Sequence, residues 1–132
     1  MKMKKILGVF MTVTMIVTSA MSVSAASASG TTSGGSNGRL STSASLVVGT
    51  SGASASTSVV SASSAPSVTT VVGIRYINYS TGRTDSNSAG GSGTYASCSP
   101  STSNYWMLDA NSSHGVYSTV WGSWETTLSD GI

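Results

Sequence analysis

Residues 67–79, SVTTVVGIRYINY, form the stretch of sequence that decides the fold class. Apolar or β-branched side chains recur at every second position, and a period of two residues is typical of a half-buried β-strand. The side chains expected on the buried face are Val68, Thr70, Val72, Ile74 and Tyr76. We therefore predict a long strand here, with Ile77 and Tyr79 on its opposite face.

Strand-like patterns continue on both sides of this stretch. Residues 40–48 and 52–59 alternate small or apolar residues with hydroxyl-bearing ones. Further strand-like segments follow at 83–90, 95–97, 105–110, 114–120 and 121–128, the first of them polar enough for a weak edge strand. No segment after residue 26 keeps apolar residues at helical spacing. About seven short strands predict an all-β fold, a small antiparallel β-sandwich of immunoglobulin-like size over residues 39–132.

The first 26 residues have the three-part layout of a secretory signal peptide. Three lysines within residues 1–5 are followed by an apolar run at 6–17 and then by small residues. Val23 and Ala25 suit positions −3 and −1 of a cut after Ala25, and cuts after Ala26 or Ala28 fit nearly as well. The apolar run is short for a membrane span. We expect a cleaved leader and a secreted, extracellular protein, with a leader in the style of a Gram-positive-type bacterium.

A segment rich in glycine and serine follows the predicted leader. Residues 27–38, SASGTTSGGSNG, contain no apolar side chain larger than alanine. Such composition is typical of flexible, disordered chain. We therefore predict that residues 27–38 are a flexible linker between the leader and the sandwich.

The 106 residues beyond the predicted leader are nearly uncharged and rich in hydroxyl groups. They include 28 serines and 14 threonines, and three arginines against four carboxylates give a net charge of −1. Three scattered arginines cannot neutralise the row of phosphates along a nucleic acid. These 106 residues also contain no polybasic segment that could bind an anionic membrane. One cysteine cannot build a disulfide framework, and one cysteine with one histidine is too small a set for a zinc site. We predict no metal and no other cofactor.

Five of the eight aromatic residues beyond the leader lie between positions 105 and 124. Trp106 and Trp124 are in phase with apolar neighbours, so we expect both in the core. Trp121 is next to Gly122, near the turn of the last predicted hairpin, and is the best candidate for exposure. The candidate binding patch consists of Trp121, Tyr117 and Tyr105, whose flat rings could stack on a sugar. The alternative is that the whole group fills the core.

Cys98 and His114 are the two other residues with chemical potential. Cys98 is a lone thiol in a chain expected to be exported, so it could react or form an intermolecular disulfide, unless it is half-buried near a loop. His114 is the only imidazole and the only ready general base, with Asp109 close in sequence. Serine is so abundant that a Ser–His–Asp set carries little information. We expect His114 instead to hydrogen-bond backbone or the hydroxyl of Ser112 or Ser113.

These features favour a secreted, non-catalytic β-domain that acts by contact with a cell-envelope component, a glycan or another protein, or in a structural role. Such domains could also associate with one another through Cys98 or through open edge strands. The leader, the short Gly/Ser-rich chain and the aromatic C-terminal region are similar in overall plan to small exported β-proteins of the lactococcin type. That resemblance implies an antimicrobial function as the alternative. A hydrolase is the third hypothesis, but the sequence shows no evident cleft and no set of metal ligands for one.

Overall fold

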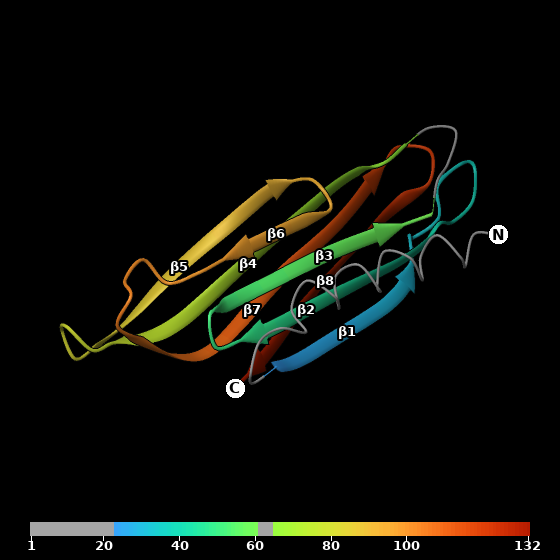
Figure 1. The fold of residues 1–132 in the computed structure, drawn as a ribbon. Coiled ribbons are helices and arrows are strands. Elements are labelled where there is room, and N and C mark those ends of the chain that lie inside the picture. Colours follow the sequence, from blue (N-terminus) through green and yellow to red (C-terminus); the bar gives the residue numbers. More distant parts are fainter. Residues whose placement is uncertain (1–22, 61–64) are drawn as a thin grey trace.

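The computed structural model describes residues 23–60 and 65–132, which form two antiparallel β-sheets packed face to face (Figure 1). One sheet has the strand order β1-β2-β3-β6, and the other has the order β5-β4-β7-β8. The strands are β1 (Val23–Thr31), β2 (Ser41–Gly49), β3 (Gly52–Val59), β4 (Ser67–Asn78), β5 (Arg83–Ser92), β6 (Tyr95–Cys98), β7 (Tyr105–Ser118) and β8 (Gly122–Gly131). The predicted all-β sandwich is confirmed. Among the described residues, no helix is long and apolar enough to span a membrane.

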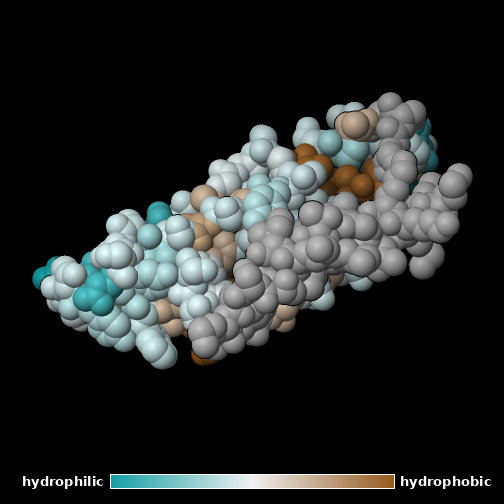
Figure 2. Space-filling view, in the orientation of Figure 1, coloured by the Kyte–Doolittle hydropathy of each residue, from teal (hydrophilic) through white to brown (hydrophobic). Residues whose placement is uncertain are grey.

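Side chains from both sheets meet in one hydrophobic core. The core cluster consists of Leu46, Val48, Ala53, Ala55, Val72, Ile74, Tyr76, Ala96, Cys98, Met107 and Ala110. Small residues of β3 and β6 thus share the core with the larger side chains of β4, and the predicted inner face of β4 is buried from Thr70 to Tyr76. Among the coloured residues that Figure 2 leaves in view, hydrophilic and near-neutral ones predominate, and the visible hydrophobic residues form small patches.

Strand β7 joins two segments that the sequence pattern had separated, and it contains a β-bulge. Arg75 of β4 pairs with Asp109, whereas the next residue, Tyr76, pairs with Met107, so Leu108 is left without a partner. An extra residue in one strand reverses the facing of the side chains beyond it. Met107 is therefore buried, and Trp106 is 58% exposed. The prediction that Trp106 belongs to the core is wrong for this reason.

The segment predicted as a flexible linker is part of the sandwich. β1 runs antiparallel to β2 from the pair Val23↔Gly49 to the pair Thr31↔Ser41, so residues 27–31 are paired strand. The loop at 32–38 then docks on the turn between β7 and β8. The Ser33 amide donates to the Ser123 carbonyl oxygen at 2.7 Å, and the Asn37 amide donates to the Val120 carbonyl oxygen at 2.7 Å. The linker prediction is wrong, and residues 1–22 of the predicted leader lie outside the described residues.

Glycines in this loop permit close contact between two stretches of backbone. A Cβ atom on Gly35 would lie 2.4 Å from both the carbonyl carbon and the oxygen of Val120, a separation that only glycine avoids. Facing it, Gly122 has a φ of +83°. Beside these glycines, the buried Thr32 hydroxyl donates to the Trp121 carbonyl oxygen and accepts from the Leu40 amide at 2.9 Å. The Gly/Ser composition of this segment therefore serves packing rather than flexibility.

Candidate functional site

The outer face of β4, β7 and β8 presents a regular array of side chains on which a partner could rest. Strand pairing aligns three residues in each row across this face, so its composition follows from the register. The rows are Thr69–Gly115–Glu125, Val71–Ser113–Thr127, Gly73–Asn111–Ser129 and Arg75–Asp109–Gly131. Two shallow hollows lie along these rows, with volumes of about 430 and 440 Å³. We call this surface the outer face.

Tyr117 dominates the first hollow. Its ring lies across Gly115, because a Cβ atom on that glycine would stand 2.4 Å from the Tyr117 hydroxyl and 2.6 Å from the ring. The hydroxyl donates to Glu125 Oε1 at 2.7 Å, and this hydrogen bond raises the pKa of the Tyr117 phenol. Since the ring is 39% exposed and anchored at its tip, it forms a fixed aromatic platform bordered by Thr69 and Val71.

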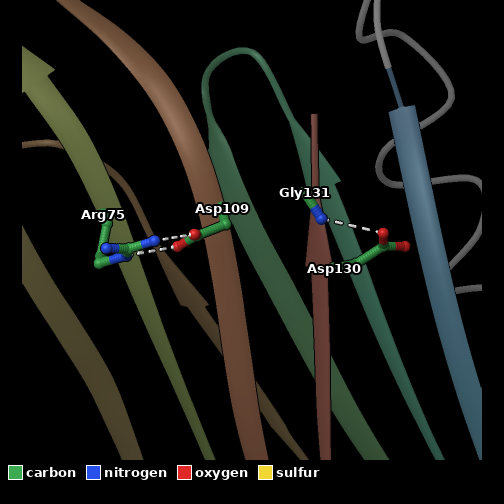
Figure 3. Close-up of polar contacts among 4 residues, drawn as sticks. All are labelled: Arg75, Asp109, Asp130 and Gly131. Carbon is green, nitrogen blue, oxygen red and sulfur yellow. Dashed lines mark hydrogen bonds and ion pairs between the residues drawn. The ribbon is translucent and has the colours of Figure 1, made fainter.

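An ion pair dominates the second hollow. Arg75 donates from both Nε and Nη2 to the two carboxylate oxygens of Asp109, the Nε contact being 2.9 Å, and the two side chains face each other across neighbouring strands (Figure 3). The hydrogen bonds from Arg75 lower the pKa of the Asp109 carboxyl. In the same view, the Asp130 carboxylate accepts from the Gly131 amide at 2.9 Å. The ion pair cancels the charge of Arg75, so this hollow is polar without a net positive charge.

The three residues of the predicted aromatic patch are not brought together. Only Tyr117 stands on the outer face. Tyr105 packs against the core, with its ring edge-on to Tyr76 at a centroid separation of 6.1 Å. Trp121 is half-buried in the β7–β8 turn beside the 32–38 loop, and its indole nitrogen is buried with no hydrogen-bond partner among the described residues. Trp121 is therefore less exposed than its position next to the turn residue Gly122 suggested.

Trp106 is the exposed aromatic residue that the sequence pattern placed in the core. It pairs with Ile77 across strands, and together with Tyr105, Met107, Thr50 and Ile132 it lines a cavity of about 180 Å³ at the end of the sandwich. The run Tyr105 to Leu108 is apolar at four consecutive positions. Such a run does not alternate, and this break in the pattern was the one available signal of the bulge.

His114 lies at the centre of a chain of hydrogen bonds that crosses the sandwich. Ser112 Oγ is 2.7 Å from the ring Nε2, and Thr57 Oγ1 is 2.8 Å from Nδ1. Thr57 Oγ1 is in turn 2.7 Å from Thr70 Oγ1, which donates to the Gly93 carbonyl oxygen at 2.9 Å. These residues come from β7, β3, β4 and the β5–β6 turn, so the chain links the two sheets.

The proton positions in this hydrogen-bond chain follow from the carbonyl oxygens beside its two threonines. The Thr70 hydroxyl donates to the Gly93 carbonyl oxygen, and the Thr57 hydroxyl donates to the Thr69 carbonyl oxygen at 3.2 Å. Each hydroxyl has a single proton, so Thr57 accepts from the ring. A neutral His114 therefore carries its proton on Nδ1 and accepts the Ser112 proton at Nε2. Burial lowers the pKa of His114 to about 4, which keeps the ring neutral at pH 7.

The candidate catalytic residues do not assemble. Asp109 binds Arg75 on the outer face, while His114 is buried and hydrogen-bonded to Ser112, as predicted. The Ser112 and Thr57 hydroxyls beside the ring are buried too. The geometry of these residues therefore serves to join the sheets. No group of three or more potential metal ligands occurs among residues 23–60 and 65–132.

Cys98 is a core residue of β6. Its side chain is buried opposite Ala53 of β3, at the rim of a hollow of about 290 Å³, and burial raises the pKa of the thiol. A thiol that is both buried and protonated is poorly placed to attack another molecule.

Comparison of the chain with protein-family models, with curated proteins and with solved structures found no match.

Proposed function

We propose that the protein is exported and acts by surface contact, as a non-catalytic domain whose outer face binds a neutral, hydroxyl-rich polymer of the cell envelope, namely a glycan. One observation carries this proposal. The Tyr117 ring is fixed over Gly115 by its hydrogen bond to Glu125, at one end of a shallow, polar surface. Rigid aromatic rings beside polar groups suit sugars, because sugars present apolar ring faces and peripheral hydroxyls.

The charges and the shape of the outer face support a neutral polymer over other partners. Arg75 is paired with Asp109, and Glu125 is the other charged side chain of the four rows. The remaining side chains are mostly hydroxyls, an amide and glycine. Such groups offer many hydrogen bonds but produce little long-range electrostatic attraction for a charged partner. The two hollows are shallow and follow the same strands, which suits an extended chain better than a compact small molecule.

The proposal is tested by co-sedimentation of the purified protein with peptidoglycan and with insoluble neutral polysaccharides. We expect Tyr117→Ala to weaken binding about tenfold, which corresponds to ~1.4 kcal/mol. Tyr79→Ala is the matched control, because Tyr79 is 53% exposed in the β4–β5 turn and lines neither hollow. Equal binding by the wild type and Tyr117→Ala would contradict the proposal that the outer face binds the polymer. Growth inhibition of related strains without polysaccharide binding would favour the antimicrobial alternative.

A further inference from the structure

We propose that the leader is removed by a cut after Ala25, and that this cut must occur before β1 docks on β2. The inference rests on the proposed export. The cut that the sequence pattern favours falls inside β1, since this strand begins at Val23. The scissile peptide bond joins Ala25 and Ala26, which lie opposite Val47 and Leu46 in the antiparallel ladder.

A folded precursor hides this bond from a peptidase. Proteins that bind an extended peptide commonly do so by pairing with its backbone, so the segment must be free of its own partners. In the fold, β1 is paired with β2, and Ser24 and Ala26 are half-buried while Ala25 points outward. Cleavage of the folded precursor therefore requires β1 to detach, and its rate is limited by that local opening.

The fold also distinguishes among the three cuts that the sequence allows. A cut after Ala25 leaves residues 26–31 in register with β2, with Ala26 and Ala28 still opposite Leu46 and Ala44. A cut after Ala28 leaves only three paired residues and removes both alanines from the inner side of β1. A cut after Ala26 removes one of them. The earliest cut therefore preserves most of the strand.

Gly30 shows how closely the retained part of β1 is packed. A Cβ atom on Gly30 would lie 2.6 Å from the indole nitrogen of Trp124, on β8 of the other sheet. β1 thus contacts both sheets, and its loss would uncover a side of the core. A valine at position 30 would force β1 away from Trp124, whereas a valine at position 29 would point outward, because Ser29 is exposed.

The first test identifies the N-terminus of the protein recovered from the culture medium, by mass spectrometry. We expect it to begin at Ala26. A chain that begins at Ser27 or Ser29 would overturn the assignment of the cut while leaving export in place. A medium without the protein, with the full chain retained in cells, would contradict the proposed export itself.

The second test measures cleavage of the full-length precursor by signal peptidase, after refolding and in urea that the peptidase tolerates. We expect cleavage of the refolded precursor to be slower by about tenfold or more, and Gly30→Val to restore a rate close to that of the unfolded chain. Ser29→Val should behave as the wild type. Equal cleavage rates for the refolded and the unfolded wild type would overturn the proposal that cleavage precedes the docking of β1 on β2. They would leave the position of the cut, after Ala25, unaffected. If neither form is cleaved, the proposed leader fails.

Discussion

At the scale of single residues, His114 joins the two sheets through its hydrogen bonds. Its two ring nitrogens contact hydroxyls of Ser112 and Thr57, and the hydrogen-bond chain ends on the Gly93 carbonyl. Every donor proton in this chain of hydrogen bonds has an acceptor when the ring is neutral. Protonation of the ring keeps these contacts, because the Ser112 hydroxyl can turn and accept, but it places a charge in a buried site.

His114 should therefore make the protein sensitive to mild acid. Its pKa is about 4 in the fold against 6.5 as the ordinary value, so the unfolded chain binds more protons between these limits. The neutral ring contributes its full share to the free energy of unfolding above about pH 6.5. This contribution is lost as the pH falls towards 4, and the total loss is about 3 kcal/mol. Urea unfolding at pH 7.0 and at pH 4.5 measures this loss.

The control for this measurement is His114→Gln, which retains a donor and an acceptor but does not titrate. It should be less stable than the wild type at pH 7.0 and should show a flat stability between pH 4.5 and pH 6.5. The Asp109 carboxyl has a lowered pKa, so the stability that it contributes is lost only at more acid pH. An unchanged slope in His114→Gln would show that other groups cause the pH dependence.

At the scale of strands, the bulge in β7 decides which aromatic residues face solvent. Leu108 has no partner on β4, and the side chains before it reverse their facing relative to those after it. Trp106 is exposed as a result, while Trp121 and Trp124 are half-buried. One unpaired residue thus moves a tryptophan from the core to the surface.

Fluorescence quenching by iodide tests this arrangement of β7. We expect Trp106→Phe to remove most of the quenchable emission, because the exposed indole is the one that an aqueous anion reaches. Trp124→Phe is the matched control and should leave the quenchable fraction nearly unchanged. The reverse result would mean that β7 pairs with β4 without the bulge.

At the scale of the whole molecule, the two sheets are joined at both of their sides without a disulfide. On one side, the 32–38 loop bonds the β7–β8 turn through Ser33 and Asn37. On the other, the Thr57 amide donates to the Thr94 carbonyl oxygen at 2.9 Å and the Gly93 amide donates to the Val68 carbonyl oxygen at 2.8 Å. Backbone contacts therefore close a sandwich whose core is built largely from small side chains.

Substitution at Gly35 measures what the loop contributes. Gly35→Ala places a Cβ atom against the Val120 carbonyl, where no flexible side chain can yield, so we expect a loss of about 2 kcal/mol in the free energy of unfolding. Gly131→Ala is the matched control, since a Cβ atom there would make only ordinary contacts at 3.6 Å and beyond. If residues 32–38 were a free linker, the two variants would have equal stability.

The sequence by itself determined the all-β class, the strands β2, β3 and β4 and the inner face of β4, because a period of two residues is a local property of the chain. It also singled out Tyr117, but not Glu125 as its partner, which depends on the register of the β7–β8 hairpin. Only the tertiary structure decided the roles of residues 27–38 and of Trp106, and the hydrogen bond by which His114 reaches Thr57 of the other sheet. The physical reason is that glycine and serine carry no hydrophobic signal when they pack backbone against backbone, and a bulge or a buried hydroxyl contact exists only once distant strands have met.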